Sequence, residues 1–372
     1  MTIDAIELFR FGASTSGESP DCILARIESS GLSGWGEAIV DAAPVDCEQW
    51  ARGTFAFLEH CLAPAIVARV LDSAESLGER MNRFRGHSLA KGAIDCAWRD
   101  LTARREGKPL WQSLGGSRPN ATLTQTLGPR QTIDELIARV SALVERGTTE
   151  ITLKLRPGWG IDVVRAVRGS FASLGIRVDF DGTASLDQRD LLFRLQDFQV
   201  AAIEQPLDAD DLVGHAMLQE SLRTPVCLDQ SITSPARARM AIDVGSCRQI
   251  RIRPDYCGGL TSALEIAAAC RNLGVACVVG CRARSNVGLR HAAALAMLDR
   301  VVAGVEMDGV EMDGVELGDV ELGGNRSPDG NAALAMPDRI DAWSEPGIGV
   351  EPDERALRTD AVASCRIETN SN

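Results

Sequence analysis

The sequence predicts an α/β protein in which a parallel barrel of alternating strands and helices follows a separate α+β domain. Five segments between residues 151 and 254 read as short buried strands: ITLKL, RVDFD, AAIEQP, PVCLDQ and QIRIRP. Helix-like segments lie between them, such as residues 162–175 and 234–245. The strands recur about every 25 residues, the length of a repeated β/α unit. Such alternation predicts a parallel sheet, and enough repeats close it into a barrel.

Each of these strands carries a charged residue near its end. In chain order they are Lys154, Asp179, Glu204, Asp229 and Arg253, separated by 25, 25, 25 and 24 residues. The carboxyl ends of barrel strands face one mouth, so these side chains should converge there. A lone acid at such a place is usually a solvated loop residue or a helix cap. Three in phase would repel one another, and a hard divalent cation such as Mg²⁺ would relieve that repulsion.

Size, charge and cysteine content narrow the class of protein. With 372 residues the chain should form two domains, and 45% hydrophobic residues suffice for a large core. The net charge of −13 argues against nucleic acid or an anionic membrane as partner. The eleven cysteines show no zinc-type or disulfide-type spacing. The sequence shows no pattern typical of a secretory or membrane-spanning segment, so we expect a cytoplasmic protein.

The first domain should cover residues 1–122. DAIELFRF and DCILARIES alternate like strands of an antiparallel sheet, and a helical region follows over residues 46–103. AKGAIDCAWRDLTARREG is its clearest amphipathic helix, with Gly107 as the stop. The barrel begins at ATLTQTLG (121–128), and Thr132 with Glu135 forms a capping box for the first barrel helix.

An acidic five-residue repeat, GVEMD GVEMD GVELG DVEL, occupies residues 304–322. It can be interpreted as a strand followed by turns that have expanded by duplication, or as an acidic cation-binding loop. The first interpretation is favoured, because Gly and Asp are ordinary turn residues and the period fits no known ligand loop.

Several motifs resemble those of the enolase superfamily. LKLRPG, VDFDG, IEQPL, CLDQS and IRPDYCGG are similar to barrel motifs of its muconate-lactonizing group, especially the o-succinylbenzoate synthase / N-acylamino acid racemase branch. The similarity extends from GWGEA (34–38), RGHSLAKGAIDCAWRDL (85–101) and LGG (114–116) to PGIGVEPDE (346–354). The resemblance therefore covers nearly the whole chain.

The resemblance implies a modified TIM barrel, (β/α)7β, with an α+β capping domain. The cap would span residues 1–122 and the barrel residues 123–322. Residues 323–372 would return to the cap and end in a frayed tail. In this family, loops of the cap cover the barrel mouth and select the substrate. The corresponding loops here would be residues 12–20 and 40–50.

The resemblance also implies a metal and a reaction. Asp179, Glu204 and Asp229 match the family's Mg²⁺ ligands, with Mn²⁺ as an alternative ion. Mg²⁺ would act as a Lewis acid on a substrate carboxylate while the α-proton is removed. The expected reaction is a dehydration like that of o-succinylbenzoate synthase, or an N-succinyl or N-acylamino acid racemisation.

The family's acid–base residues are altered in this sequence. The family carries a KxK motif on the second barrel strand and a lysine on the sixth, which here read Lys154-Leu155-Arg156 and Arg253. An arginine, with a pKa of about 12.5 or higher, is almost never neutral at pH 7 and makes a poor base. Lys154 is therefore the predicted proton-transfer residue, with Arg156 and Arg253 as fixed cations, and a one-base lyase reaction is favoured over racemisation.

The substrate side of the site should be cationic. GCRARSNVG places Arg282, Arg284 and Ser285 near the rim, where they would bind an anionic small-molecule carboxylate. We also expect a homo-oligomer. The alternative is a non-catalytic, metal-dependent binding protein for an anionic metabolite. An ion pair between Lys154 and Asp181 would favour that alternative, whereas an amine directed at the substrate would favour an enzyme.

Overall fold

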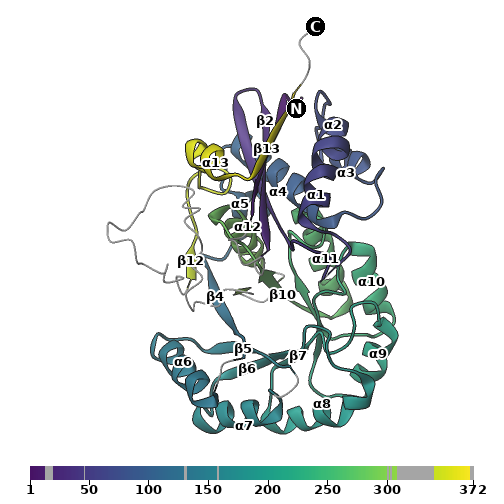
Figure 1. The fold of residues 1–372 in the computed structure, drawn as a ribbon, viewed down its shortest axis with the longest axis vertical. Coiled ribbons are helices and arrows are strands. Elements are labelled where there is room, and N and C mark those ends of the chain that lie inside the picture. Colours follow the sequence, from purple (N-terminus) through teal and green to yellow (C-terminus); the bar gives the residue numbers. More distant parts are fainter. Residues whose placement is uncertain are drawn as a thin grey trace.

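The computed structural model has two parts, a barrel and a cap that lies over one end of it (Figure 1). The structure describes residues 1–12, 20–45, 47–129, 132–156, 159–299, 301, 304–307 and 339–368. Buried side chains form two hydrophobic clusters, a larger one mainly in the barrel and a smaller one in the cap.

The barrel consists of eight parallel strands with a helical connection after each of the first seven. The strands are β4 (Asn120–Leu127), β5 (Glu150–Lys154), β6 (Gly175–Asp179), β7 (Ala202–Glu204), β8 (Val226–Leu228), β9 (Gln249–Ile252), β10 (Ala276–Cys281) and β11 (Val305–Met307). The helices are α6 (Ile133–Glu145), α7 (Ile161–Ser170), α8 (Arg189–Leu195), α9 (Leu212–Ser221), α10 (Pro235–Asp243), α11 (Leu260–Leu273) and α12 (Asn286–Ala296). Pairing of β11 with β4 closes the barrel, which confirms the predicted (β/α)7β fold.

Local sequence explains why the barrel units begin and end where they do. The strand residues are buried almost throughout, as expected for strands covered by helices on one side and by the barrel interior on the other. The first helix, α6, begins with the predicted capping box. The Glu135 amide donates to Thr132 Oγ1 at 3.2 Å, and the Thr132 amide donates to Glu135 Oε2 at 3.4 Å.

The cap is built on a four-stranded antiparallel sheet in the order β13-β1-β2-β3. Its strands are β1 (Ala5–Phe11), β2 (Asp21–Ser29), β3 (Leu32–Val40) and β13 (Ala363–Glu368). Its helices are α1 (Ala51–Phe57), α2 (Ala63–Ile66), α3 (Ala74–Met81), α4 (Ser88–Arg105) and α5 (Leu110–Ser113), with a π-helical turn, Leu58–Leu62, between the first two. Near the C-terminus lie β12 (Arg339–Asp341), which pairs with β4, and α13 (Glu354–Asp360).

One part of the expectation for the C-terminal segment was wrong. Residues 363–368 are not frayed, because β13 pairs with β1 along six residue pairs, from Ala5 opposite Glu368 to Arg10 opposite Ala363. Alternate side chains of β13 are partly covered, which gives a polar-looking segment a place in the sheet. Residues 369–372 lie outside the described residues.

The long helix α4 packs directly on strand β3, and two glycines permit this contact. A Cβ at Gly34 would collide with the backbone of Ala97 and Leu101, and one at Gly36 with the backbone of Ala93. The GWGEA motif therefore serves close helix–sheet packing. It also sets the position of Glu37, which follows Gly36 and points to the barrel.

Two sequence expectations fall partly outside the described residues. Residues 13–19 and 46 of the expected cap loops, and residues 308–322 of the acidic repeat, are not described. The start of the repeat forms β11, as the strand interpretation predicted. No helix within the described ranges is long and apolar enough to cross a membrane.

Candidate active site

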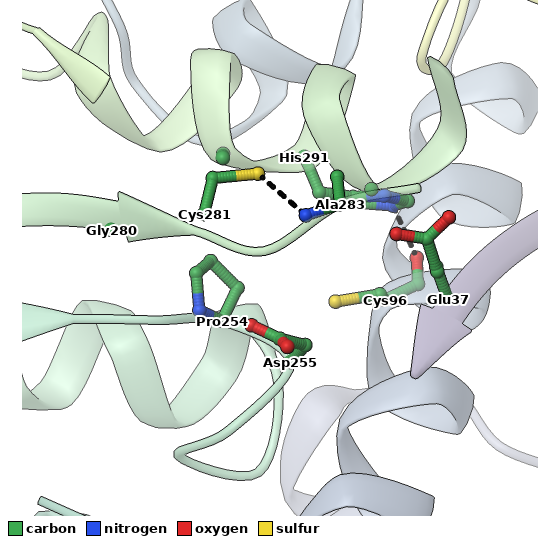
Figure 2. Close-up of a pocket in the computed structure, with 10 residues that line it drawn as sticks. Glu37, Cys96, Pro254, Asp255, Gly280, Cys281, Ala283 and His291 are labelled. Atoms are coloured by element: carbon green, nitrogen blue, oxygen red, sulfur yellow. Dashed lines mark hydrogen bonds between the residues drawn. The ribbon is translucent and has the colours of Figure 1, made fainter. Parts of the chain in front are cut away.

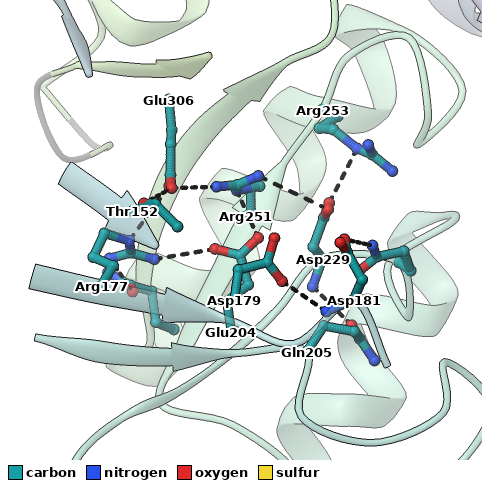
Figure 3. Close-up of polar contacts among 12 residues, drawn as sticks. Thr152, Arg177, Asp179, Asp181, Glu204, Gln205, Asp229, Arg251, Arg253 and Glu306 are labelled. Atoms are coloured by element: carbon teal, nitrogen blue, oxygen red, sulfur yellow. Dashed lines mark hydrogen bonds and ion pairs between the residues drawn. The ribbon is translucent and has the colours of Figure 1, made fainter. Parts of the chain in front are cut away.

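Three carboxylates converge at the carboxyl ends of neighbouring barrel strands (Figure 3). Asp179 ends β6, Glu204 ends β7, and Asp229 directly follows β8. Asp179 and Glu204 are partners in the strand register. The three residues are only 1%, 0% and 2% exposed, and the charges of Asp179 and Asp229 act on the Glu204 carboxyl, so the three carboxylates lie near one another in the protein interior.

Two arginines and a fourth carboxylate lie in the barrel interior next to these three carboxylates (Figure 3). Arg251 Nε lies 3.0 Å from Glu204 Oε1, and its Nη2 lies 2.5 Å from Glu306 Oε1. Arg177 contacts the other oxygens of the same two acids, at 3.6 Å for Glu204 and 3.3 Å for Glu306. Thr152 donates its hydroxyl to Glu306. The part of the barrel interior next to the carboxylates is therefore an ion-pair network.

The two glutamates of this network differ in acidity. Burial raises the pKa of Glu204 well above its usual value, and the negative charges of Glu306, Asp179 and Asp229 raise it further, against the lowering effect of Arg251. Burial also acts to raise the pKa of Glu306, but Arg251 and Arg177 outweigh it, so that pKa is lowered. The negative charge of Glu306 is thus better compensated by the neighbouring arginines than that of Glu204. An added positive charge would therefore stabilise ionised Glu204 more than ionised Glu306.

Lys154 lies at the end of β5 and is held by an ion pair. Its Nζ is 2.8 and 2.7 Å from the two carboxylate oxygens of Asp181 and 3.4 Å from Asp179 Oδ2. Gln230 donates to the same Asp181 at 3.2 Å. Asp181 has a left-handed backbone, φ 48°, and its amide donates to Asp179 Oδ1 at 2.9 Å. An ion pair between Lys154 and Asp181 was the arrangement expected for the alternative function, that of a non-catalytic binding protein.

The two arginines at the family's lysine positions have different surroundings. Arg253 is 3% exposed, its Nε lies 3.0 Å from Asp229 Oδ1, and its guanidinium stacks on Tyr256 at 4.2 Å from the ring centroid. Arg156 follows β5 and is exposed. Arg253 is therefore built into the carboxylate cluster, whereas Arg156 stands at the rim.

The arginines of the β10–α12 loop join the barrel to the cap. Arg282 Nη2 lies 3.3 Å from Asp41 Oδ1, and Arg284 Nη1 donates to the Pro20 carbonyl at 3.0 Å. Ser285 donates its hydroxyl to Glu37, which also accepts the Arg284 amide at 3.2 Å. The loop predicted to bind substrate therefore contacts Pro20 and Asp41, which belong to the two cap segments that were expected to cover the barrel mouth.

Glu37 is a buried carboxyl at this cap–barrel junction. Burial raises its pKa to about 7, against the lowering effect of the hydrogen bond from Ser285. A small cavity of about 20 Å³ adjoins it, lined also by Cys96, Asp255, Cys281 and His291 (Figure 2). Burial raises the pKa of Asp255 and lowers that of His291 to about 4. The cavity has room for about one water molecule and is too small for a substrate.

Sequence reasoning missed Arg177, Arg251 and Glu306. A signal for the arginines was present, because each stands two residues before a strand-end residue, and alternation points both to the same side of the strand. Glu306 lay inside the acidic repeat, where it could not be distinguished from its copies. Gln205 was also missed: its side-chain oxygen accepts the Asp229 and Ser231 amides at 3.0 and 3.2 Å, which orients the third carboxylate.

The carboxylate cluster has the donor chemistry of a site for a hard divalent cation. It offers oxygens from three acids, and the two Glu204 oxygens already lie next to positive charge, that of the Arg251 and Arg177 guanidinium groups. Among the described residues, however, no three His, Cys, Asp or Glu side chains are already arranged around a common metal position. The donors fit such an ion, but their present arrangement is the one set by the arginine ion pairs.

Comparisons with known proteins agree with this architecture. Residues 9–115 match the family description "Mandelate racemase / muconate lactonizing enzyme, N-terminal domain", and residues 135–356 match "Enolase C-terminal domain-like". An o-succinylbenzoate synthase of Geobacillus kaustophilus is 37% identical over 273 residues, 73% of each chain. An N-succinylamino acid racemase of Thermus thermophilus is 35% identical over 307 residues, 80% of this chain and 83% of that one.

A solved structure supports the same assignment. An enolase superfamily member from Listeria innocua superposes with a TM-score of 0.86 at 25% identity and covers 99% of both chains. Members of this superfamily generally use a divalent metal ion, usually Mg²⁺. The chain belongs to the enolase superfamily, in its mandelate racemase / muconate lactonizing enzyme group, and is an enzyme of the lyase or isomerase (racemase) type.

Proposed function

We propose that this enzyme removes the α-proton of a small carboxylate substrate at the barrel mouth and stabilises the resulting enediolate. The observation that supports this proposal is the meeting of Asp179, Glu204 and Asp229 with Lys154 at the carboxyl ends of adjacent strands. In a parallel barrel this end carries the chemistry. The named activities of the relatives, o-succinylbenzoate synthase and N-succinylamino acid racemase, suggest succinyl-bearing substrates.

The three carboxylates would hold Mg²⁺, and Mn²⁺ is the alternative ion. When bound, the metal would supply positive charge for the substrate carboxylate, which makes the neighbouring α-proton more acidic. Gln205 would keep the Asp229 backbone in position through its two accepted hydrogen bonds. Asp181, which holds Lys154, would set the resting position of the amine beside Asp179.

Lys154 is proposed as the proton-transfer residue. Its side chain is 25% exposed, so a substrate in the mouth can reach it, and its amine must leave Asp181 before it can take a proton. Arg253 and Arg156 act as fixed cations beside the developing negative charge, because an arginine seldom loses its proton at neutral pH. With one lysine, the expected reaction is a one-base elimination of water and not a two-base racemisation.

The cap-facing loop would form the wall of the substrate site. Arg282, Arg284 and Ser285 contact the cap residues Asp41, Pro20 and Glu37. We assign this loop to recognition of the anionic part of the substrate, because the Arg282 and Arg284 guanidinium groups can bind a carboxylate in a directed way, while the Ser285 hydroxyl would hold the loop in place through Glu37.

Exchange of the α-proton in D₂O, followed by ¹H NMR with N-succinyl amino acids and Mg²⁺, tests the proposal. The parent should exchange slowly, Lys154→Met should not exchange, and Arg156→Lys with Arg253→Lys should exchange faster than the parent. Arg239→Met, an exposed arginine on α10, is the control and should behave as the parent does.

The outcomes separate the residue roles from the reaction class. Exchange that survives Lys154→Met but is lost in Arg253→Met would refute the role given to Lys154. Absence of exchange with every carboxylate, in the parent and in the lysine-restored variant, would refute the proposed reaction and support the non-catalytic alternative.

A further inference from the structure

A single buried arginine contacts two of the three proposed metal ligands. Arg251 is 1% exposed and stands on β9, with its side chain in the barrel interior (Figure 3). Its Nε lies 3.0 Å from Glu204 Oε1, and its Nη1 lies 4.0 Å from Asp229 Oδ2. Its Nη2 pairs with Glu306 Oε1 at 2.5 Å. One guanidinium therefore links three of the buried carboxylates.

Each carboxylate at the centre of the barrel contacts at least one cationic side chain. Four carboxylates are buried there: Asp179, Glu204, Asp229 and Glu306. Four cationic side chains contact them: Lys154, Arg177, Arg251 and Arg253. A cluster of buried acids would otherwise lose protons only at high pH, since mutual repulsion and burial both oppose ionisation.

Glu306 keeps Arg251 in place from the opposite side. Its oxygens accept the Thr152 hydroxyl and pair with both Arg251 and Arg177. Glu306 belongs to β11, the strand that closes the barrel against β4. Arg251 is thus fixed between the closing strand and the proposed metal ligands, and it cannot swing into solvent as a surface arginine can.

We infer that Arg251 is a built-in countercharge for the carboxylate cluster, an inference that rests on the proposed function. It holds Glu204 and Asp229 in the metal-free protein, so the centre of the barrel stays folded without a divalent cation. It also competes with that cation for the same oxygens, which lowers the affinity of the site. The enzyme therefore binds its metal weakly and reversibly and depends little on it for stability.

Replacing Arg251 with methionine, which keeps much of the volume and removes the charge, tests both consequences. In protein dialysed against EDTA, Arg251→Met should melt several degrees below the parent, because Glu204 loses its nearest cation. Titration with Mn²⁺, followed by electron paramagnetic resonance, should show binding at least about tenfold tighter than in the parent. Added Mn²⁺ should also raise the melting temperature of the variant more than that of the parent.

Arg168→Met is the matched control. Arg168 is a partly buried arginine that donates to the backbone carbonyls of Phe198, Ala172 and Leu174, which precede β6 and β7 and so lie at the opposite end of these strands from the carboxylate cluster. Its loss should lower the melting temperature while leaving Mn²⁺ affinity and the Mn²⁺-induced shift as in the parent. Equal Mn²⁺ affinity and equal shifts in parent and Arg251→Met would overturn the inference.

A second variant covers the case in which Arg251→Met does not fold. Glu306→Gln with Arg251→Met removes the arginine together with its shortest ion-pair partner and leaves Glu204 in contact with Arg177, so it should fold in EDTA. If the double variant also fails to fold, Arg251 acts through packing, and the inference is wrong. These readouts use no substrate, so proton exchange can fail while the Arg251 result stands, and the reverse holds equally.

Discussion

Replacing Glu37 with glutamine should remove a loss of stability that the parent shows as the pH rises from about 5 to 8. Glu37 is 3% exposed at the junction of the cap and the barrel. It accepts hydrogen bonds from Ser285 and from the Arg284 amide. Burial raises its pKa from 4.5 to about 7, and the nearby charge of Asp255 acts in the same direction.

The sign and size of the effect follow from proton linkage. Between pH 4.5 and about 7 the folded protein keeps a proton that the unfolded chain has already released. The contribution to stability is therefore fully present below pH 4.5 and is lost as the pH rises through about 7. A pKa difference of this size corresponds to about 3 kcal/mol of unfolding free energy. Glutamine does not titrate, so Glu37→Gln lacks this term.

Urea unfolding at a series of pH values between about 5 and 8 measures the effect as the difference between parent and variant. Taking the difference cancels the titrating groups that do not interact with Glu37, and Asp255, which does interact with it, acts in the same direction. Glu220→Gln, an exposed carboxyl on α9, is the control and should give a difference that does not change with pH. A parent-minus-Glu37→Gln difference that is constant over this range would refute the reasoning about the buried carboxyl.

Three further outcomes are expected. Glu204→Gln should abolish Mg²⁺ binding measured by calorimetry, because it removes a charge from the proposed ligand set and keeps its shape; unchanged affinity would contradict the assignment. Arg282→Met with Arg284→Met should weaken binding of a dicarboxylate far more than that of a neutral analogue in competition titrations, and equal losses would argue against an anion site. Gly36→Ala should lower the unfolding free energy by more than about 2 kcal/mol, since its Cβ would meet the Ala93 backbone, and an unchanged thermal melt would contradict the close packing.

Much of the barrel could be predicted because its signals are local and repeated. A strand and a helix every 25 residues or so leave a period in the sequence, and the residue at each strand end keeps its phase. Lys154, Asp179 and Glu204 therefore fall into register on β5, β6 and β7 from spacing alone. The capping box of α6 was equally visible, because Thr132 and Glu135 are only three residues apart.

The C-terminal strand was missed for the opposite reason. Residues 363–368 look polar, and their pairing partner β1 lies more than 350 residues earlier in the chain. An edge strand on a cap sheet needs only alternate residues to be covered, so its sequence shows little apolar signal. The partners of Arg282 and Arg284, Asp41 and Pro20, are hidden in the same way.

The sequence by itself determined which charged residues lie at the mouth of the barrel, because the strand period sets their position along each strand and the face of the sheet on which they lie. Only the tertiary structure decided which charge pairs with which. Arg251 meets Glu306 because β11 closes the barrel against β4, and Lys154 meets Asp181 because the chain after β6 turns back in a left-handed conformation. Ion pairs form across space between strands far apart in the chain, so their partners depend on closure and register, which no local pattern records.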